Sequence, residues 1–288
     1  MKSTSLTAAQ TARSNASPDP PPTLRTMSRI DDIFATLRAG NKRALMPFVV
    51  GGYPGLDTTE MVISGLTDAG ACIAEIGFPF SDPIADGPVI AAAMYETLKN
   101  GTTIDTLLAT IERVRPQTEA GLIAMVSESI VHRRGGSPFI EELAQAGFDG
   151  VIIPDIDHAA ADELLPTIDR CDLAFAMLVA PTTTPQRLPE LIDRCRGFVY
   201  LLAQTGLTGA RSDLPDLSDR VAAIRTLTDL PIAAGFGIST PDQVASATAT
   251  CDAAIVGSAL VDRMAPETDA TAAAIEFINM LSNGLPDG

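Results

Sequence analysis

Eight short apolar runs recur between residues 46 and 258, and each is followed by a loop and a stretch with helical periodicity. The runs are nearly continuous in Val, Ile, Leu and Ala, which is typical of parallel strands buried on both faces. They are MPFVVGG (46–52), CIAEIGF (72–78), GLIAMVS (121–127), DGVIIPD (149–155), LAFAMLVAP (173–181), GFVYLLAQ (197–204), PIAAGFG (231–237) and DAAIVGS (252–258). The sequence therefore predicts an α/β fold with a parallel sheet.

The strand-like runs alternate with an equal number of predicted helices, which indicates a closed (β/α)₈ TIM barrel. A further helix over 29–40 precedes the first strand and is predicted to cover the bottom of the barrel. The rival fold is a doubly wound open sheet, but GGYPG (51–55) is not its phosphate-loop motif. The helices of the barrel are predicted over 58–70, 88–101, 140–147, 160–169, 185–195, 217–228, 240–250 and 269–284.

Residues 1–26 differ in composition from the rest of the chain. They are rich in Ser, Thr, Ala and Pro, which predicts a disordered tail. They contain no apolar stretch of the kind found in secretory signals, and arginine is sparse for an organelle transit peptide. Residues 27–288 are predicted to form one catalytic domain.

Charge and cysteine content exclude several classes of protein. Lys and Arg total 20 against 36 Asp and Glu, and this net charge of −16 argues against nucleic-acid binding. No apolar run reaches the roughly 18 residues of a membrane span. No metal site is predicted, because the cysteines and histidines lack metal-ligand spacing. The four cysteines are interpreted as buried thiols of a cytoplasmic protein.

Glu75 and Asp86 are the candidate catalytic residues. Glu75 lies near the end of the second run, and active sites of barrels lie at the carboxyl ends of the strands. A lone acid on a strand is more often a salt-bridged structural residue. The loop FPFSDPIADGP (78–88) adds Asp86 and three stiffening prolines, which suits a positioned acid/base group. The alternative for Asp86 is capping of the helix that Gly87 and Pro88 open.

Three glycine-rich loops predict a phosphate-binding corner. They are GFGIST (235–240) after the seventh strand, GSALVDR (257–263) after the eighth, and QTGLTGARS (204–212) after the sixth. Many barrels bind phosphate at the loops after strands seven and eight. Gly237 and Gly257 would allow close approach of an anion, and Ser258 would begin a helix whose free N–H groups point outward.

Several of these segments together resemble the tryptophan synthase α-subunit family. The resemblance extends from about residue 29 to the carboxyl terminus, and SDPIADGP (81–88) is its most specific part. It implies cleavage of indole-3-glycerol phosphate to indole and glyceraldehyde 3-phosphate by a retro-aldol reaction that needs no cofactor. The matching segments are MPFVVGGYPG (46–55), EIGFPFSDPIADGPVI (75–90), GFVYLLAQTGLTGAR (197–211), PIAAGFGISTPDQV (231–244) and AIVGSALV (254–261).

The resemblance also implies a role for individual residues. Glu75 would be the general acid/base at indole C3, and Asp86 would bind the indole N–H and stabilise the cationic ring. Phe48 and Tyr200 would line the indole pocket. The residues expected at the mobile loop and the phosphate are Thr208, Gly209, Gly237, Gly257 and Ser258.

The expected partner is a tryptophan synthase β subunit, in an α2β2 heterotetramer. Pro79, Asp82 and Pro83 match the surface that would face it. Two segments depart from the family pattern on that surface: MVSESIVHRRGG (125–136) lacks an aromatic residue followed by Asn, and Asp157 replaces a proline.

These departures leave three alternatives open. The β subunit has diverged in step with this surface, or the chain is a stand-alone lyase that releases free indole, or it is a non-catalytic homologue. The third is disfavoured because the candidate catalytic acids are retained. A Schiff-base aldolase is disfavoured because none of the eight runs contains a lysine.

Overall fold

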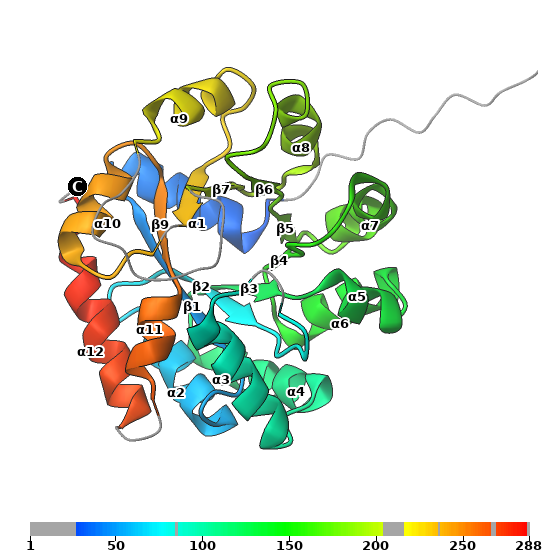
Figure 1. The fold of residues 1–288 in the computed structure, drawn as a ribbon, viewed down its shortest axis with the longest axis vertical. Coiled ribbons are helices and arrows are strands. Elements are labelled where there is room, and N and C mark those ends of the chain that lie inside the picture. The colour runs from blue at the N-terminus through cyan, green and yellow to red at the C-terminus, as the bar shows by residue number, and fades with distance from the viewer. Residues whose placement is uncertain (1–26, 84–85, 204–215, 236, 266–268, 287–288) are drawn as a thin grey trace, which may run out of the picture.

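The protein folds around a parallel sheet whose strands run through the centre of a ring of helices (Figure 1). The structure, a computed structural model, describes residues 27–83, 86–203, 216–235, 237–265 and 269–286. In the described residues the strands are β1 (Ala44–Val50), β2 (Ile73–Gly77), β3 (Gly121–Met125), β4 (Gly150–Ile152), β5 (Ala174–Phe175), β6 (Leu178–Val179), β7 (Val199–Leu202), β8 (Ile232–Gly235) and β9 (Ala253–Val256).

The strand order shows that the sheet closes into a barrel. It runs β5-β4-β3-β2-β1-β9-β8-β7-β6, and each pair of neighbours in this order is parallel. The first and last strands of this order are consecutive in the chain, with only Ala176 and Met177 between them. β5 and β6 are therefore two halves of one barrel strand, and the predicted (β/α)₈ barrel is confirmed.

The helices surround the barrel, and each of the nine predicted helices is present. α2 ends at Gly65, five residues before the predicted end at Gly70, whose positive φ of 90° serves the turn into β2. The helices of the described residues are α1 (Arg29–Ala39), α2 (Leu56–Gly65), α3 (Pro88–Lys99), α4 (Ile104–Val114), α5 (Glu128–Arg133), α6 (Ser137–Ala146), α7 (His158–Arg170), α8 (Leu188–Arg194), α9 (Ser218–Arg225), α10 (Pro241–Thr248), α11 (Ser258–Arg263) and α12 (Ala270–Ser282).

α4 was not predicted, although its sequence carries strong helix signals. Thr103 and Thr106 form a reciprocal capping box at its start. Leu107, Ile111 and Val114 are fully buried on one face at helical spacing. The prediction placed one helix in each connection between strands. Because α3 already lies between β2 and β3, the second helix in that connection was not predicted.

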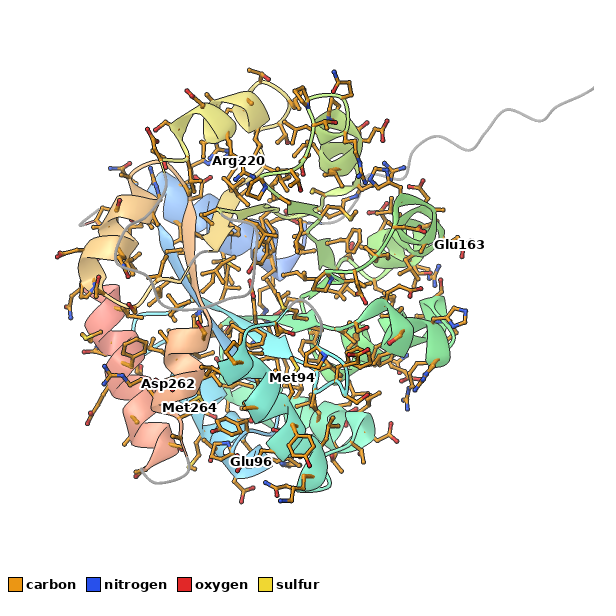
Figure 2. The ribbon with its side chains drawn as sticks, viewed as in Figure 1. Met94, Glu96, Glu163, Arg220, Asp262 and Met264 are labelled. Carbon is orange, nitrogen blue, oxygen red and sulfur yellow. The ribbon has the colours of Figure 1, made fainter. Side chains whose placement is uncertain are left out.

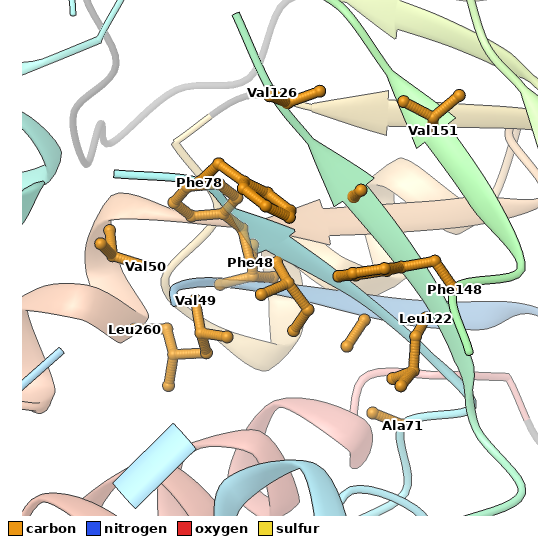
Figure 3. Packing of buried hydrophobic residues seen from close by; sticks show 14 of the residues in the cluster. Phe48, Val49, Val50, Ala71, Phe78, Leu122, Val126, Phe148, Val151 and Leu260 are labelled. Carbon is orange, nitrogen blue, oxygen red and sulfur yellow. The ribbon is translucent and has the colours of Figure 1, made fainter. Parts of the chain in front are cut away.

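α1 closes the bottom of the barrel, as predicted. Ser28 caps it in a reciprocal box with Asp31. Ile30 and Phe34 are buried among the side chains that fill the barrel, and the rings of Phe34 and Phe198 lie 6.1 Å apart. The second, larger core lies between the strands and the helices, where Phe78 and other apolar side chains pack (Figure 3). Both cores bury apolar surface and position the strand ends.

Two ion pairs fasten the amino ends of the strands by the same arrangement. Asp149, just before β4, accepts hydrogen bonds from the Leu122 N–H (2.8 Å) and from Arg115 (2.8 Å). Asp252, just before β9, accepts from the Ile232 N–H (2.8 Å) and from Arg225. Each aspartate therefore satisfies the first free backbone donors of the neighbouring strand and holds a helix-borne arginine in place.

Asp149→Ala is expected to lower the free energy of unfolding by about 3 kcal/mol, because it leaves a partly buried guanidinium and a strand N–H without their acceptor. The Asp149 and Arg115 side chains are 14% and 17% exposed. Urea denaturation measures the loss. The control is Glu141→Gln, in the exposed Arg170–Glu141 pair, which should cost less than about 1 kcal/mol. Equal effects of the two changes would contradict a stabilising role for Asp149.

Candidate active site

Glu75 lies in the middle of β2 and points into the barrel. Ile73, two residues earlier on the strand, belongs to the cluster that fills the barrel, and side chains two apart share a face. Its neighbours in the sheet are Phe48 on β1 and Ile123 on β3. Glu75 is 0% exposed, and it is the one carboxylate among the fully buried residues of the described chain.

The surroundings of Glu75 favour its protonated form. Neither carboxyl oxygen has a hydrogen-bond partner in the described part of the chain. Burial without a counter-charge disfavours the ionised form and raises the pKa of Glu75 from 4.5 to about 8. The described residues therefore give Glu75 no salt-bridge partner. At neutral pH this side chain carries a proton that it can donate inside an apolar barrel.

Asp86 lies at the mouth of the barrel, just before α3. It is half-buried, and burial raises the pKa of its carboxyl to about 6. α3 begins at Pro88 and its N-cap residue is Gly87, so Asp86 does not occupy the capping position and that alternative is wrong. At neutral pH Asp86 is ionised while Glu75 is protonated.

Tyr200 on β7 lies near both candidate carboxyl groups. Its side chain is 8% exposed, and burial raises the pKa of its phenol. The negative charges of Glu75 and Asp86 each raise that pKa further. The carboxyl groups of Glu75 and Asp86 therefore lie close enough to Tyr200 for their charges to act on its phenol.

Glycines make room for the aromatic rings around this space. If residue 77 carried a Cβ, that atom would lie 2.5 Å from Cζ of Phe48. A Cβ on Gly235 would lie 2.9 Å from the Tyr200 hydroxyl. Phe48 and Ile90 both lie about 3.8 Å from the Cβ position of Gly257. The structure adds Ile90 to the site, and its sequence context on α3 gives no sign of that location.

The structure brings together three of the residues predicted to bind the phosphate. Gly237 follows β8 and has a positive φ of 29°, and Gly257 follows the neighbouring strand β9. Gly257 is the residue before α11, with no side-chain cap, and Ser258 is buried as the first residue of that helix. Gly237, Gly257 and Ser258 thus lie at the carboxyl ends of adjacent strands. Thr208 and Gly209 lie outside the described residues.

A family model for the tryptophan synthase alpha chain matches residues 34–285. The chain belongs to this family. It is 42% identical over 240 residues to the tryptophan synthase alpha chain of Chloroflexus aggregans, covering 83% of this chain and 90% of the relative. It is similar to a tryptophan synthase structure from Mycobacterium tuberculosis, with a TM-score of 0.83 and 32% identity over 90% of this chain and 98% of that one.

A second solved structure has the same fold. It is the tryptophan synthase alpha subunit of Legionella pneumophila, with a TM-score of 0.82 and 28% identity, covering 90% of this chain and 98% of that one. The Chloroflexus aurantiacus alpha chain is 40% identical over 259 residues, covering 88% of this chain and 97% of the relative. The match therefore spans the barrel of this alpha-chain family member from end to end.

The residues expected to face a partner differ in their exposure. Asp82 is exposed and Pro83 is half-buried, so both present surface at the mouth of the barrel. Pro79 is buried within the chain itself. In this conformation Pro79 therefore offers less surface to a partner than Asp82 and Pro83 do.

The two departures from the family pattern have local structural roles. Ser127 caps α5, and Asp155 accepts hydrogen bonds from the Ser127 hydroxyl (2.9 Å) and the Glu128 N–H (2.8 Å). Asp157 caps α7 by accepting from the Ala160 N–H (2.9 Å). A proline at this position could not make that bond, so the aspartate is a helix cap.

Two other kinds of site are absent from the described residues. No group of three or more His, Cys, Asp or Glu side chains there could hold a metal ion. No helix within the same residues is long and apolar enough to cross a membrane.

The buried Glu75 should make stability depend on pH. Between pH 4.5 and 8 the folded chain binds one proton more than the unfolded chain, so the contribution of Glu75 to stability falls as pH rises. In Glu75→Gln this dependence disappears. The free energy of unfolding of the variant, relative to the unaltered chain, should rise by up to about 3 kcal/mol between pH 5 and pH 7.5. Urea denaturation across this range measures it.

The exposed Asp82→Asn variant is the matched control, because its carboxylate stays solvated on folding. Its difference from the unaltered chain should stay constant over the same pH range. If Glu75→Gln also gave a constant difference, Glu75 would not be protonated in the folded state.

Proposed function

We propose that this chain is a carbon–carbon lyase that cleaves indole-3-glycerol phosphate to indole and glyceraldehyde 3-phosphate. Membership of the tryptophan synthase alpha chain family supports this assignment. The observation that carries it is the pair of carboxyl groups around Tyr200, whose pKa values of about 8 and about 6 keep one protonated while the other is ionised. Such separation provides an acid and a stabilising anion in one site.

Glu75 would act first as the acid and then as the base. Its proton passes to indole C3, which places a positive charge on the ring nitrogen. The glycerol hydroxyl next to C3 then gives its proton to the Glu75 carboxylate and becomes the aldehyde. The electron pair of the broken C–C bond returns to the indole ring. The proton that Glu75 gave is recovered, so the cycle needs no oxidant and no cofactor.

Asp86 would bind the indole N–H and stabilise the cationic ring. With a pKa of about 6 it is ionised at neutral pH, so it can accept the N–H hydrogen bond. The interaction strengthens as positive charge develops on the nitrogen, which lowers the barrier to C–C cleavage. Phe48, Tyr200 and Ile90 would hold the flat indole ring between the two carboxyl groups.

The phosphate would bind at the corner between β8 and β9. Gly237, Gly257 and Ser258 would offer backbone N–H groups there, and the resemblance to the family implies that Thr208 and Gly209 would also contact the phosphate. We also propose that residues 27–288 form the catalytic domain. A chain that begins at Met27 should therefore turn over substrate as fast as the full chain.

A tryptophan synthase β subunit is the proposed partner, in an α2β2 assembly. Asp82 and Pro83 would contact it, and Ser127, Glu128 and Asp157 would give this chain an altered contact surface. These departures equally favour a stand-alone lyase, because they replace residues that resemblance places against the β subunit. The two functions share one chemistry and differ in their dependence on the partner.

Indole release by the purified protein, measured with and without its cognate β subunit, tests the proposal. Strong stimulation is expected for an α subunit, whereas fast release alone would identify the stand-alone lyase. Glu75→Gln should abolish release while the protein stays folded, and Asp86→Asn should lower it by at least about a hundredfold. The proposal fails if no indole forms under either condition, or if Glu75→Gln turns over normally.

The pH dependence of kcat/KM should show the ionisation of Glu75. As Glu75 loses its proton it can no longer protonate C3, so kcat/KM is expected to fall above an apparent pKa of about 8. The substrate phosphate itself titrates near pH 6, so the alkaline side is the informative one. The residual activity of Asp86→Asn should keep this alkaline fall. A rate that stays level to pH 10 would contradict the role of Glu75.

A further inference from the structure

Arg220 of α9 reaches the carboxyl ends of two barrel strands (Figure 2). Its Nη1 donates to the carbonyl of Leu202 (2.7 Å), and its Nη2 donates to the carbonyl of Val179 (3.0 Å). These are the last residues of β7 and β6, the strand ends next to Tyr200. The guanidinium therefore lies at the mouth of the barrel, at the end that carries the candidate active site.

Arg220 is half-buried and has no carboxylate partner in the described residues. Burial lowers the pKa of its guanidinium, and no charge within the described part of the chain shifts that pKa further. Arg43 shares this lack of a carboxylate but lies before β1, at the bottom of the barrel. The other half-buried arginines each pair with an acid: they are Arg115, Arg134, Arg194, Arg196 and Arg225.

An unpaired, partly desolvated cation is unfavourable by itself. A guanidinium has five N–H donors, and the two carbonyls of Arg220 use only some of them. The carbonyls carry no net charge, so they do not balance its charge. An anion that arrives at the mouth would supply both the missing charge and acceptors for the remaining donors.

The acidic loops after β2 and β4 would repel such an anion. The chain has a net charge of −16, and Asp82, Asp155 and Asp157 are exposed on the loops after β2 and β4. Salt screens charges that lie more than about 8 Å apart. A cation at the mouth therefore acts on an approaching anion more strongly than the distant negative charges of the chain do. We propose that Arg220 receives the phosphate group of the substrate at the mouth and draws the substrate into the site. This inference rests on the proposed function.

Arg220→Met and Arg220→Lys, with Arg43→Met as the matched control, test this role. Steady-state kinetics at low and high salt give KM and kcat, and calorimetry measures binding of glycerol 3-phosphate, which requires no turnover. Arg220→Met should raise KM roughly five- to tenfold and weaken glycerol 3-phosphate binding by a similar factor. It should change kcat less than about twofold and reduce the salt dependence of kcat/KM. Arg220→Lys should be intermediate, and Arg43→Met should behave as the unaltered chain.

The alternative is that Arg220 only ties β6 to β7, which share just two register pairs. In that case Arg220→Met would lower the melting temperature and kcat but leave KM, anion binding and salt dependence unchanged, and the proposal would be overturned. Normal behaviour of Arg220→Met in every measurement would overturn it too. If the unaltered chain released no indole, the lyase assignment would fail. Weaker glycerol 3-phosphate binding by Arg220→Met would still support the anion role.

Discussion

The burial of Glu75 without a counter-charge is the constraint on which the rest of the site depends. An ionised carboxylate in that position would cost several kcal/mol, so the side chain keeps its proton until the pH approaches about 8. β2 is paired on both sides, with Phe48 of β1 and Ile123 of β3 beside Glu75, so the side chain stays inside the barrel. The same dry surroundings make the proton available for transfer to a bound substrate.

The amino ends of the strands carry interactions that stabilise the barrel, whereas the carboxyl ends carry the candidate active site. At the amino ends of the strands, α1 fills the opening and Asp149 and Asp252 bind arginines and free strand N–H groups. Asp149 is paired there with Arg115, and Asp252 with Arg225. At the carboxyl ends lie Glu75 and Arg220, which lack counter-charges in the described residues. Unbalanced groups at one end of a rigid frame are what a site for an anionic, proton-accepting substrate requires.

The fold and the candidate acids could be predicted from sequence because they depend on local patterns. The apolar runs have the period of buried strands, and Glu75 interrupts one of them near its carboxyl end. Contacts between segments that are distant in the sequence leave no such local pattern, so they could not be predicted. The burial of Pro79, the position of Asp86 before rather than at the helix cap, and the reach of Arg220 to two strand ends depend on packing between distant segments. α4 carries clear helix signals in its sequence but was not predicted, because it and α3 both lie in the connection between β2 and β3.

The most direct measurement is a titration of the Glu75 carboxyl group itself. Infrared difference spectra of the isolated protein, unaltered against Glu75→Gln, isolate the carbonyl stretch of this one side chain. A protonated carboxyl signal that persists at pH 7 and disappears with a pKa of about 8 is the expected result. A signal that is already that of a carboxylate at pH 6 would contradict the picture of a buried, proton-carrying acid.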